Sequence, residues 1–372
     1  MLNEHLDYVA DATRLALFKT ALAKAISPGD SVADLGCGSG ILGLLSLQAG
    51  AGKVYAIDDS AMIEVARETF EKAGYGEHAA CLRGKSGRIE LPERVDAVVC
   101  DHVGYFGFDY GLIEFLADAR RRFLKPGGRL MPSRLRLYAA AVGSQKCSEL
   151  ARSWLAEGIP PEFHWLNGHA RNAKHALSLA REDVLGPPAV LGEIDLQADN
   201  PEFLSWNAEL RIGRDGTVDG LAGWFECALA EGVWMTNSPL ADNPIRRPQA
   251  FLPIGEAMPV RRGDSVKAVI MARPADHLIA WNVEFPAAGR RFSQSTWQGQ
   301  LLSPEDLLRA NPERVPQPGR EGQARAAVLA YCDGRRSARE IEQAVLRDHP
   351  GLYPTAAEIS RFVFQVLGRD TE

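Results

Sequence analysis

The chain has 372 residues, more than one hydrophobic core usually holds, so the sequence predicts two or three domains. With 46% hydrophobic and 24% charged residues, the composition excludes a largely disordered chain, and the net charge of -6 argues against a nucleic-acid partner. The sequence has no long apolar stretch and no secretion signal, and its six cysteines lack the spacing of a zinc site or a disulfide framework, so we expect a cytoplasmic protein with no membrane partner.

The first third of the chain alternates between helical and strand-like hydrophobic patterns. The expected elements are a helix over residues 11–25, a strand over 31–35, a helix over 41–49, a strand over 53–57, a helix ending at Phe70 and a strand over 97–100. Such alternation is typical of an α/β fold with a doubly wound parallel sheet. We expect this Rossmann-like domain to occupy residues 1–132.

After Pro132 the pattern changes to short alternating runs separated by Gly, Pro and Asp. These runs cover residues 135–142, 203–212, 222–229, 265–271 and 277–285. They predict an antiparallel β-barrel domain over residues 133–302. Residues 147–181 lack the alternation and have a helical, irregular pattern, so we expect a helical arm inserted at about residues 145–182.

A third pattern begins near Pro304 and continues beyond a linker at Pro316–Gly319. Helical periodicity in this Ala-, Arg- and Glu-rich tail predicts helices over residues 326–331, 337–346 and 356–367. Ser337 is a candidate helix cap because Glu340 stands three residues later. We therefore expect a small helical domain over residues 303–372.

Glycines follow the first predicted strand at a spacing that indicates a nucleotide-type site. The strand ends at Asp34 and Leu35, and Gly36, Gly38 and Gly40 lead into the next helix, so backbone N–H groups can approach a polar ligand. The spacing is tighter than the Gly-x-Gly-x-x-Gly fingerprint, which seats a pyrophosphate. It suits a ligand with a methionine-type tail and no phosphate.

The second predicted strand ends in Asp58 and Asp59, where an acidic side chain can accept both hydroxyl groups of a ribose. Asp58 is the better candidate. Alternatively, the glycines form only a tight turn and Asp58 caps a helix. The combination with Asp34 favours S-adenosylmethionine as the cofactor and methyl transfer as the reaction.

With these residues in place, the first three hundred positions resemble the protein arginine methyltransferase family. His5 and Arg14 match a His and an Arg of its leading segment, and the segment from Asp34 to Leu42 matches its first motif. Further matches are Arg83–Lys85, Leu91–Pro92, Val98–Phe106, Trp224–Cys227, Thr236–Pro239 and Trp281–Phe285. The resemblance implies a class I methyltransferase domain, a β-barrel, and a helical dimerisation arm that forms a homodimer.

The resemblance also implies a set of residues that contact the cofactor. Arg14 would contact the carboxylate of the cofactor, and because one glutamate of the family's adenine segment aligns with Gly87, Ser86 and backbone groups are expected to contribute more there. The expected cofactor residues are His5, Arg14, Asp34, Gly36, Cys37, Gly38, Gly40, Ile41, Leu42, Asp58, Asp59, Lys85, Ser86 and Asp101.

The sequence departs from the family on the acceptor side. The family's hairpin carries two glutamates that hold a guanidinium; here their positions hold Asp101 and Tyr110, with Asp109 adjacent, and the family's Thr-His-Trp loop aligns with residues 245–247. Replacing a carboxylate with a phenol removes a charge-assisted bond of about 1.5–3 kcal/mol. The substitutions argue against arginine as the acceptor, and an imidazole, amide, carboxylate or amine of a peptide fits them as well.

Four residues of the same hairpin are the predicted catalytic residues. In-line methyl transfer depends mainly on orientation, which contributes about 7–11 kcal/mol, so one carboxylate can suffice to remove a proton. Asp101 is the preferred base, with Tyr105 and Tyr110 as pocket walls. His102 is an alternative base because its ordinary pKa lies near neutrality, or it packs beneath the hairpin. No metal site is expected, since the histidines at 164, 169 and 175 lack a ligand spacing.

The tail from Val328 to Ile341 is similar to the helical part of PqqD-like domains. That resemblance implies a winged-helix module that binds the leader of a ribosomally made peptide by adding it as a strand, which would hold the substrate near millimolar effective concentration. A helical appendage that stabilises a dimer is the alternative. The sequence thus favours methylation of a peptide or protein side chain; a small-molecule N- or O-methyltransferase and an inactive cofactor-binding scaffold remain alternatives.

Overall fold

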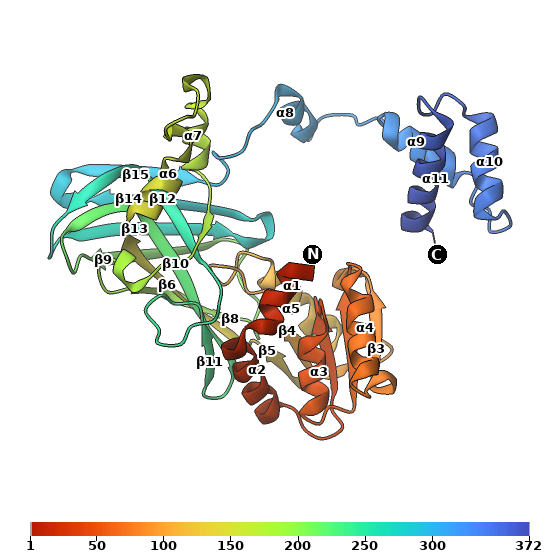
Figure 1. The fold of residues 1–372 in the computed structure, drawn as a ribbon, viewed down its shortest axis with the longest axis horizontal. Coiled ribbons are helices and arrows are strands. Elements are labelled where there is room, and N and C mark those ends of the chain that lie inside the picture. The colour runs from red at the N-terminus through yellow and green to blue at the C-terminus, as the bar shows by residue number, and fades with distance from the viewer. Residues whose placement is uncertain (1, 372) are drawn as a thin grey trace. The chain divides into compact units, whose positions relative to one another are not determined.

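A computed structural model describes residues 2–371, and the chain divides into two compact units, residues 1–301 and residues 302–372 (Figure 1). The first unit contains a parallel sheet followed by a β-rich part. The second unit is helical. Each unit has a hydrophobic core of its own, so each is described by itself.

The parallel sheet has the strand order β3-β2-β1-β4-β5. Its strands are β1 (Ser31–Leu35), β2 (Lys53–Asp58), β3 (Ala79–Arg83), β4 (Val95–Cys100) and β5 (Leu124–Met131). Every residue of β1 is buried, as expected for a central parallel strand covered on both faces. From β1 the chain forms β2 and β3 on one side of β1, and then crosses to form β4 and β5 on the other side. The strand order therefore reverses between β1 and β4, and such sheets bind ligands at this switch point.

Five helices accompany this sheet. They are α1 (Leu2–Ala10), α2 (Ala12–Ala25), α3 (Ile41–Gln48), α4 (Met62–Lys72) and α5 (Leu112–Arg122). The helices α2, α3 and α4 contact one another in series, whereas α5 packs on β4 and β5 (Figure 1). Asp11 caps α2 by accepting a hydrogen bond from the backbone N–H of Arg14. The Rossmann-like fold predicted from the alternating pattern is therefore confirmed.

The β-rich part consists of two antiparallel sheets. One has the order β7-β12-β10-β6-β8, with β11 paired to β10, and the other has the order β15-β14-β13-β9. The strands are β6 (Arg134–Val142), β7 (His175–Leu177), β8 (Ala189–Asp195), β9 (Leu204–Arg211), β10 (Gly216–Ala230), β11 (Val233–Thr236), β12 (Gln249–Val260), β13 (Ser265–Arg273), β14 (Leu278–Phe285) and β15 (Arg290–Ser295).

This pairing confirms the β-rich, antiparallel character but differs from the predicted barrel. The described strands form two separate sheets rather than one closed sheet. The two sheets contact each other where β8 lies beside β9 and β12 beside β15, and the indole N–H of Trp281 in β14 donates a 2.7 Å hydrogen bond to the carbonyl of Pro253 in β12. Alternating patterns record which side of a strand is buried, not which strand lies next to it, so they could not distinguish a barrel from paired sheets.

One hydrophobic core extends through both the parallel sheet and the β-rich part of the first unit, and a second, smaller cluster lies around Trp224 and Phe251. The larger core includes Phe18 of α2, Phe106 before α5, Phe225 of β10 and Trp281 of β14. At Gly223 in β10 an added Cβ would come within 2.4 Å of the Phe106 ring, so the two halves of the unit are in close contact there. The boundary expected near residue 132 therefore separates two types of sheet but not two cores.

The predicted arm contains the short helices α6 (Gln145–Ala151) and α7 (Leu166–Ala170) and ends in β7. In Figure 1, α7 projects from the β-rich part. Several large apolar side chains of this segment face solvent, including Phe163 and Trp165, the latter 61% exposed. The homodimer expected from the family resemblance stays a prediction.

The second unit contains α8 (Pro304–Ala310), α9 (Arg320–Leu329), α10 (Ala338–Asp348) and α11 (Ala356–Asp370). The predicted cap is confirmed, because the Ser337 hydroxyl and the Glu340 carboxylate form a reciprocal capping box. The first predicted helix was placed too late, since α9 begins at Arg320 and ends at Leu329. Residues 302–371 contain no strand, so the wing and the sheet edge of the expected winged-helix module are not found there. None of the helices described in residues 2–371 is long and apolar enough to cross a membrane.

Candidate active site

A cavity of about 720 Å³ lies at the carboxyl ends of β1, β2 and β4. This is the end of the sheet where ligands bind in open parallel folds. Seven residues predicted from the sequence line it: His5, Gly36, Asp58, Asp59, Lys85, Ser86 and His102. Glu114, Phe115 and Asp118 of α5 line it as well; sequence analysis did not identify these three, because the helix that carries them was not predicted.

The glycine loop between β1 and α3 has a backbone that other residues rarely adopt. Gly36, Gly38 and Gly40 have φ angles of 64°, 52° and 80°. A Cβ at Gly36 would lie 2.1 Å from Nε2 of His102, and one at Gly38 would lie 2.7 Å from the ring of His5. The loop is therefore restricted to glycine both by conformation and by the neighbouring imidazoles.

Asp58 at the end of β2 holds this loop in place. Its Oδ2 accepts a 2.8 Å hydrogen bond from the Gly38 N–H, and its Oδ1 accepts bonds from the N–H and hydroxyl of Ser60. The carboxylate both lines the cavity and supports the loop, so the ligand-binding and structural interpretations of Asp58 are compatible. Asp59 lines the cavity beside it.

Asp34 lies beneath the loop and is almost fully buried. Burial raises the pKa of its carboxyl group to about 7, even though its Oδ2 accepts a 2.7 Å hydrogen bond from the Gly43 N–H. Of the other expected cofactor residues, Cys37, Gly38, Gly40, Ile41 and Leu42 form the loop and the start of α3 without lining the cavity.

Asp101 follows β4 directly and lies in a buried cluster of ion pairs. Leu35 pairs with Cys100, so Gly36 and Asp101 leave the sheet side by side. The Arg14 Nε donates a 2.6 Å hydrogen bond to Asp101 Oδ2, and the Arg247 Nη2 donates one of 3.2 Å to the same oxygen. The exposed fractions of the Arg14, Asp101 and Arg247 side chains are 4%, 8% and 8%.

The charge balance of this cluster decides the state of Asp101. Burial alone would raise the pKa of its carboxyl group, but the guanidinium groups of Arg247 and Arg14 outweigh burial and lower it. Asp101 is therefore ionised and engaged by two cations. A carboxylate in that state is a poor acceptor for a proton, which weakens the sequence-based preference for Asp101 as the base.

The remaining predicted catalytic residues lie in the hairpin that follows. The rings of Tyr105 and Tyr110 lie 5.4 Å apart, and the Lys174 ammonium stands 5.4 Å and 5.3 Å from their centroids. Lys174 also forms a salt bridge with Asp109, which in turn accepts a 2.9 Å hydrogen bond from the Phe106 N–H. Neither tyrosine lines the cavity.

The β-rich part fixes the position of this hairpin. The Asn237 side chain donates hydrogen bonds to the carbonyls of Tyr105 and Pro248, at 2.9 Å and 2.8 Å, and accepts one from the Phe225 N–H. Arg247, in the same loop, donates to the carbonyl of Val103 at 2.6 Å. The loop before β12 and the hairpin after β4 therefore form one wall.

His102 occupies the boundary between the cavity and the hairpin. Its ring lies against Gly36 and meets the Phe115 ring edge-on, with the centroids 5.1 Å apart. Burial lowers the pKa of its imidazole, so the ring is uncharged at neutral pH. The structure thus combines the two sequence-based interpretations, because His102 packs under the hairpin and also faces the cavity.

The sequence of this chain is similar to those of known methyltransferases. Residues 11–135 match the family described as ribosomal protein L11 methyltransferase (PrmA). The chain is 29% identical over 271 residues to an arginine N(omega)-methyltransferase from Streptomyces achromogenes subsp. streptozoticus, covering 70% of this chain and 74% of the relative. It is 27% identical over 286 residues to protein arginine N-methyltransferase 6 from Xenopus tropicalis, covering 73% and 84%.

The chain is an S-adenosylmethionine-dependent methyltransferase. Its fold is that of two solved structures, each 20% identical to it. One is the Trypanosoma brucei PRMT1 enzyme–prozyme heterotetrameric complex with AdoHcy, with a TM-score of 0.71 over 79% of this chain and 98% of that one. The other is protein arginine methyltransferase 10 from Arabidopsis thaliana, with a TM-score of 0.68 over 80% and 98%.

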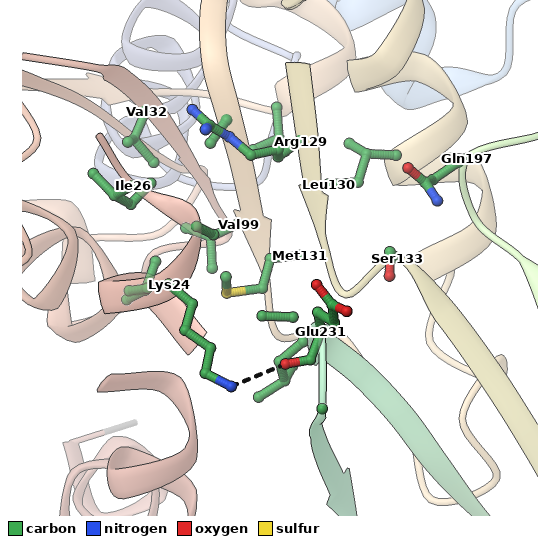
Figure 2. Close-up of a pocket in the computed structure, with 17 residues that line it drawn as sticks. Lys24, Ile26, Val32, Val99, Arg129, Leu130, Met131, Ser133, Gln197 and Glu231 are labelled. Carbon is green, nitrogen blue, oxygen red and sulfur yellow. Dashed lines mark hydrogen bonds between the residues drawn. The ribbon is translucent and has the colours of Figure 1, made fainter. Parts of the chain in front are cut away.

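A second cavity of the methyltransferase, of about 780 Å³, lies away from this site (Figure 2). It opens between the end of α2, the middle of β4, the end of β5 and the β10–β11 turn, where the Lys24 ammonium donates a hydrogen bond to the Glu231 carbonyl. None of the described residues that line it belongs to the predicted site. It lacks the glycine loop and the acidic strand ends, so we do not assign the cofactor to it.

Besides the three residues of α5, Arg247 and Lys174 were not predicted from the sequence as functional. Arg247 was aligned with a family loop but given no role, and Lys174 carried no signal, because a lysine in an irregular segment is usually solvated. Both neutralise carboxylates of the hairpin.

Across residues 2–371, the structure brings no three His, Cys, Asp or Glu side chains together in an arrangement that could hold a metal ion.

Proposed function

We propose that this methyltransferase transfers the methyl group of S-adenosylmethionine to a side chain of a peptide or protein. The observation that carries the proposal is the continuous likeness, across both the parallel sheet and the β-rich part, to a relative named for protein substrates. The hairpin between these two parts, held by Asn237, provides a wall on which an extended chain can lie.

The cavity has the features that the cofactor requires. Its volume of about 720 Å³, the glycine loop without room for side chains and the acidic end of β2 all suit a nucleoside with an amino-acid tail. We propose that Asp58 and Asp59 bind the ribose, that Lys85 and Ser86 border the adenine, and that Arg14 and the loop over Asp34 hold the amino-acid tail. When bound, the cofactor supplies an activated methyl group.

The residues beyond the cavity then position the acceptor. We propose that Tyr105 and Tyr110 form the walls of the acceptor pocket and that Asp101 orients Arg14 and Arg247 rather than removing a proton. His102, uncharged and facing the cavity, is the group that can accept a proton where the acceptor has one to lose.

The proposal also includes a homodimer, a leader-binding role for the second unit and a cytoplasmic location. The exposed apolar arm around Trp165 suits a contact between two copies of the chain in a homodimer. The helical second unit is the candidate binding site for a leader segment of a ribosomally made precursor; because residues 302–371 contain no strand, such a segment would bind against helices. All six cysteines are unpaired, which suits the cytoplasm.

Two alternatives each have an observation in their favour. The Streptomyces relative is named for arginine and not for protein, which favours a small-molecule N- or O-methyltransferase. The engagement of Asp101 by two guanidinium groups, together with the enzyme–prozyme composition of the Trypanosoma complex, favours an inactive partner that only binds cofactor.

One assay separates the three. The full chain is incubated with S-adenosylmethionine and either a peptide library or a pool of amino acids and other metabolites, and both the demethylated cofactor and the masses of the acceptors are measured. Peptides that gain a methyl group support the proposal, and methylation of metabolites alone supports the small-molecule alternative. Cofactor binding in calorimetry without any turnover supports the inactive partner. The Asp58→Ala variant, which loses the proposed ribose contact, is the control.

A further inference from the structure

Both carboxylates of the acceptor hairpin are already paired with cations of the same chain. We propose that Arg247 is a built-in guanidinium that fills the cation-binding position beside Asp101, so that the methyltransferase acts on an acceptor without positive charge, with a carboxylate oxygen the best fit. The inference rests on the proposed function, because it names the acceptor class for the same site.

The geometry of Arg247 is that of a bound ligand rather than of a surface side chain. Its two terminal nitrogens face the two oxygens of Asp101, at 3.5 Å and 3.2 Å, and one of them donates a 2.6 Å hydrogen bond to the Val103 carbonyl. Its guanidinium also stands 5.6 Å from the centre of the Tyr8 ring. A planar cation from a substrate would require these same contacts.

The electrostatics argue against a second cation at this position. Arg14 and Arg247 already place two positive charges against the single carboxylate of Asp101 in a buried site. A third cation beside Asp101 would lose its hydration while that carboxylate is already held by two guanidinium groups, and uncompensated buried charge is strongly disfavoured. Asp11, another buried carboxylate near Arg14, accepts hydrogen bonds from the backbone N–H groups of Arg14 and Arg246.

The second carboxylate of the hairpin is also paired with a cation, which independently argues against a cationic acceptor. Asp109, the second hairpin carboxylate, forms a salt bridge with Lys174, which comes from the arm. The Lys174 ammonium also faces the rings of Tyr105 and Tyr110, the position from which an aromatic wall could otherwise attract a cationic acceptor. The cations Arg247 and Lys174 therefore leave neither hairpin carboxylate without a cationic partner.

Two hairpin carboxylates that are already paired with cations suit an acceptor that presents lone pairs instead of positive charge. In the transfer, a lone pair of the acceptor forms the new bond to the methyl carbon while the carbon–sulfur bond breaks and its electron pair stays on sulfur. A carboxylate becomes a neutral ester and the sulfonium a neutral thioether, so no proton has to be removed. This agrees with a site whose nearest carboxylate, Asp101, is held by two cations.

The first test measures the pocket without relying on turnover. Ethylguanidinium and acetate are titrated by calorimetry into the full chain saturated with demethylated cofactor, for the wild type, Arg247→Ala and Arg246→Ala. Arg246 is the matched control because it is the adjacent arginine and its side chain is exposed. We expect ethylguanidinium to bind Arg247→Ala at least about ten-fold more tightly than the wild type or the control. Equal binding to the wild type and Arg247→Ala, or no binding to either, overturns the proposal.

A second measurement covers the case in which Arg247→Ala does not fold. Arg247→Met keeps most of the side-chain volume without the charge and receives the same titrations. In parallel, the wild type is given peptides that are identical except for Arg or Glu at the central position. Methylation of the Glu peptide supports the proposal, and faster methylation of the Arg peptide overturns it. If neither peptide is methylated, the proposed function is in question, and the ethylguanidinium result still decides the role of Arg247.

Discussion

The buried carboxyl group of Asp34 lowers the stability of the folded chain when it ionises, and the substitution Asp34→Asn measures that effect. The carboxyl group is 1% exposed, and burial raises its pKa from 3.8 to about 7. Because the folded-state pKa lies above the unfolded one, the folded chain binds this proton more tightly. Its contribution to stability is fully present below pH 3.8 and is lost as the pH rises through 7.

The magnitude follows from the two pKa values. At 1.36 kcal/mol for each pH unit, ionising this carboxyl group above pH 7 lowers the free energy of unfolding by about 4 kcal/mol. An asparagine of nearly the same shape does not ionise. We therefore expect Asp34→Asn to be more stable than the wild type at pH 8, with an advantage that grows by about 2 kcal/mol between pH 5.5 and pH 8.

Urea unfolding at several pH values, without cofactor, measures this difference. All seven tryptophans lie between residues 154 and 297, so their fluorescence reports only on the unit that contains Asp34. Asp96→Asn is the matched control of opposite sign. There the Lys125 ammonium and the hydroxyl and N–H of Ser31 outweigh burial and lower the pKa of the Asp96 carboxyl group to about 2, so that variant should lose stability at pH 8. An Asp34→Asn chain that is no more stable than the wild type at pH 8, or whose advantage does not change with pH, would refute the reasoning.

Three other outcomes are expected. Asp101→Asn leaves two buried guanidinium groups without a counter-charge, so the free energy of unfolding should fall by about 3–5 kcal/mol in the same urea assay, and an unchanged value would contradict the ion-pair cluster. Ser337→Ala removes a cap of α10 and should lower the free energy of unfolding of the second unit by about 1 kcal/mol. Circular dichroism at 222 nm, recorded while an isolated fragment 302–372 is heated, measures this loss, and an unchanged melting midpoint would argue against the cap. Deleting residues from 320 onward should raise the Michaelis constant for a full-length precursor but not for its short core peptide, and equal effects on both would indicate a structural tail.

The glycine loop and the acidic strand end that border the cavity could be predicted from the sequence because their signals are local. Gly36, Gly38 and Gly40 are required by backbone conformation, and Asp58 follows a strand that its own residues define. The carboxyl ends of neighbouring parallel strands meet at one edge of the sheet, so residues far apart in the chain could be grouped without knowing a single side-chain contact.

The ion pairs of Asp101 and Asp109 could not be predicted in the same way because the paired residues are far apart in the sequence. Arg247 is 146 residues from Asp101, and Lys174 is 65 residues from Asp109. No periodicity or spacing joins these pairs, and an arginine or lysine in a loop is usually solvated. The tail illustrates the same limit: helical periodicity located α10 and α11, but nothing in it indicated whether strands would accompany them.

The continuous core of the first unit limits how the molecule can be divided. Because Phe106 packs against Gly223 and the buried residues of α2 and β10 belong to one cluster, a fragment that stops near residue 132 would leave a large apolar surface in water. Such a fragment should aggregate instead of binding cofactor as an independent module. The two halves share buried residues of one cluster, so we expect them to unfold in a single transition.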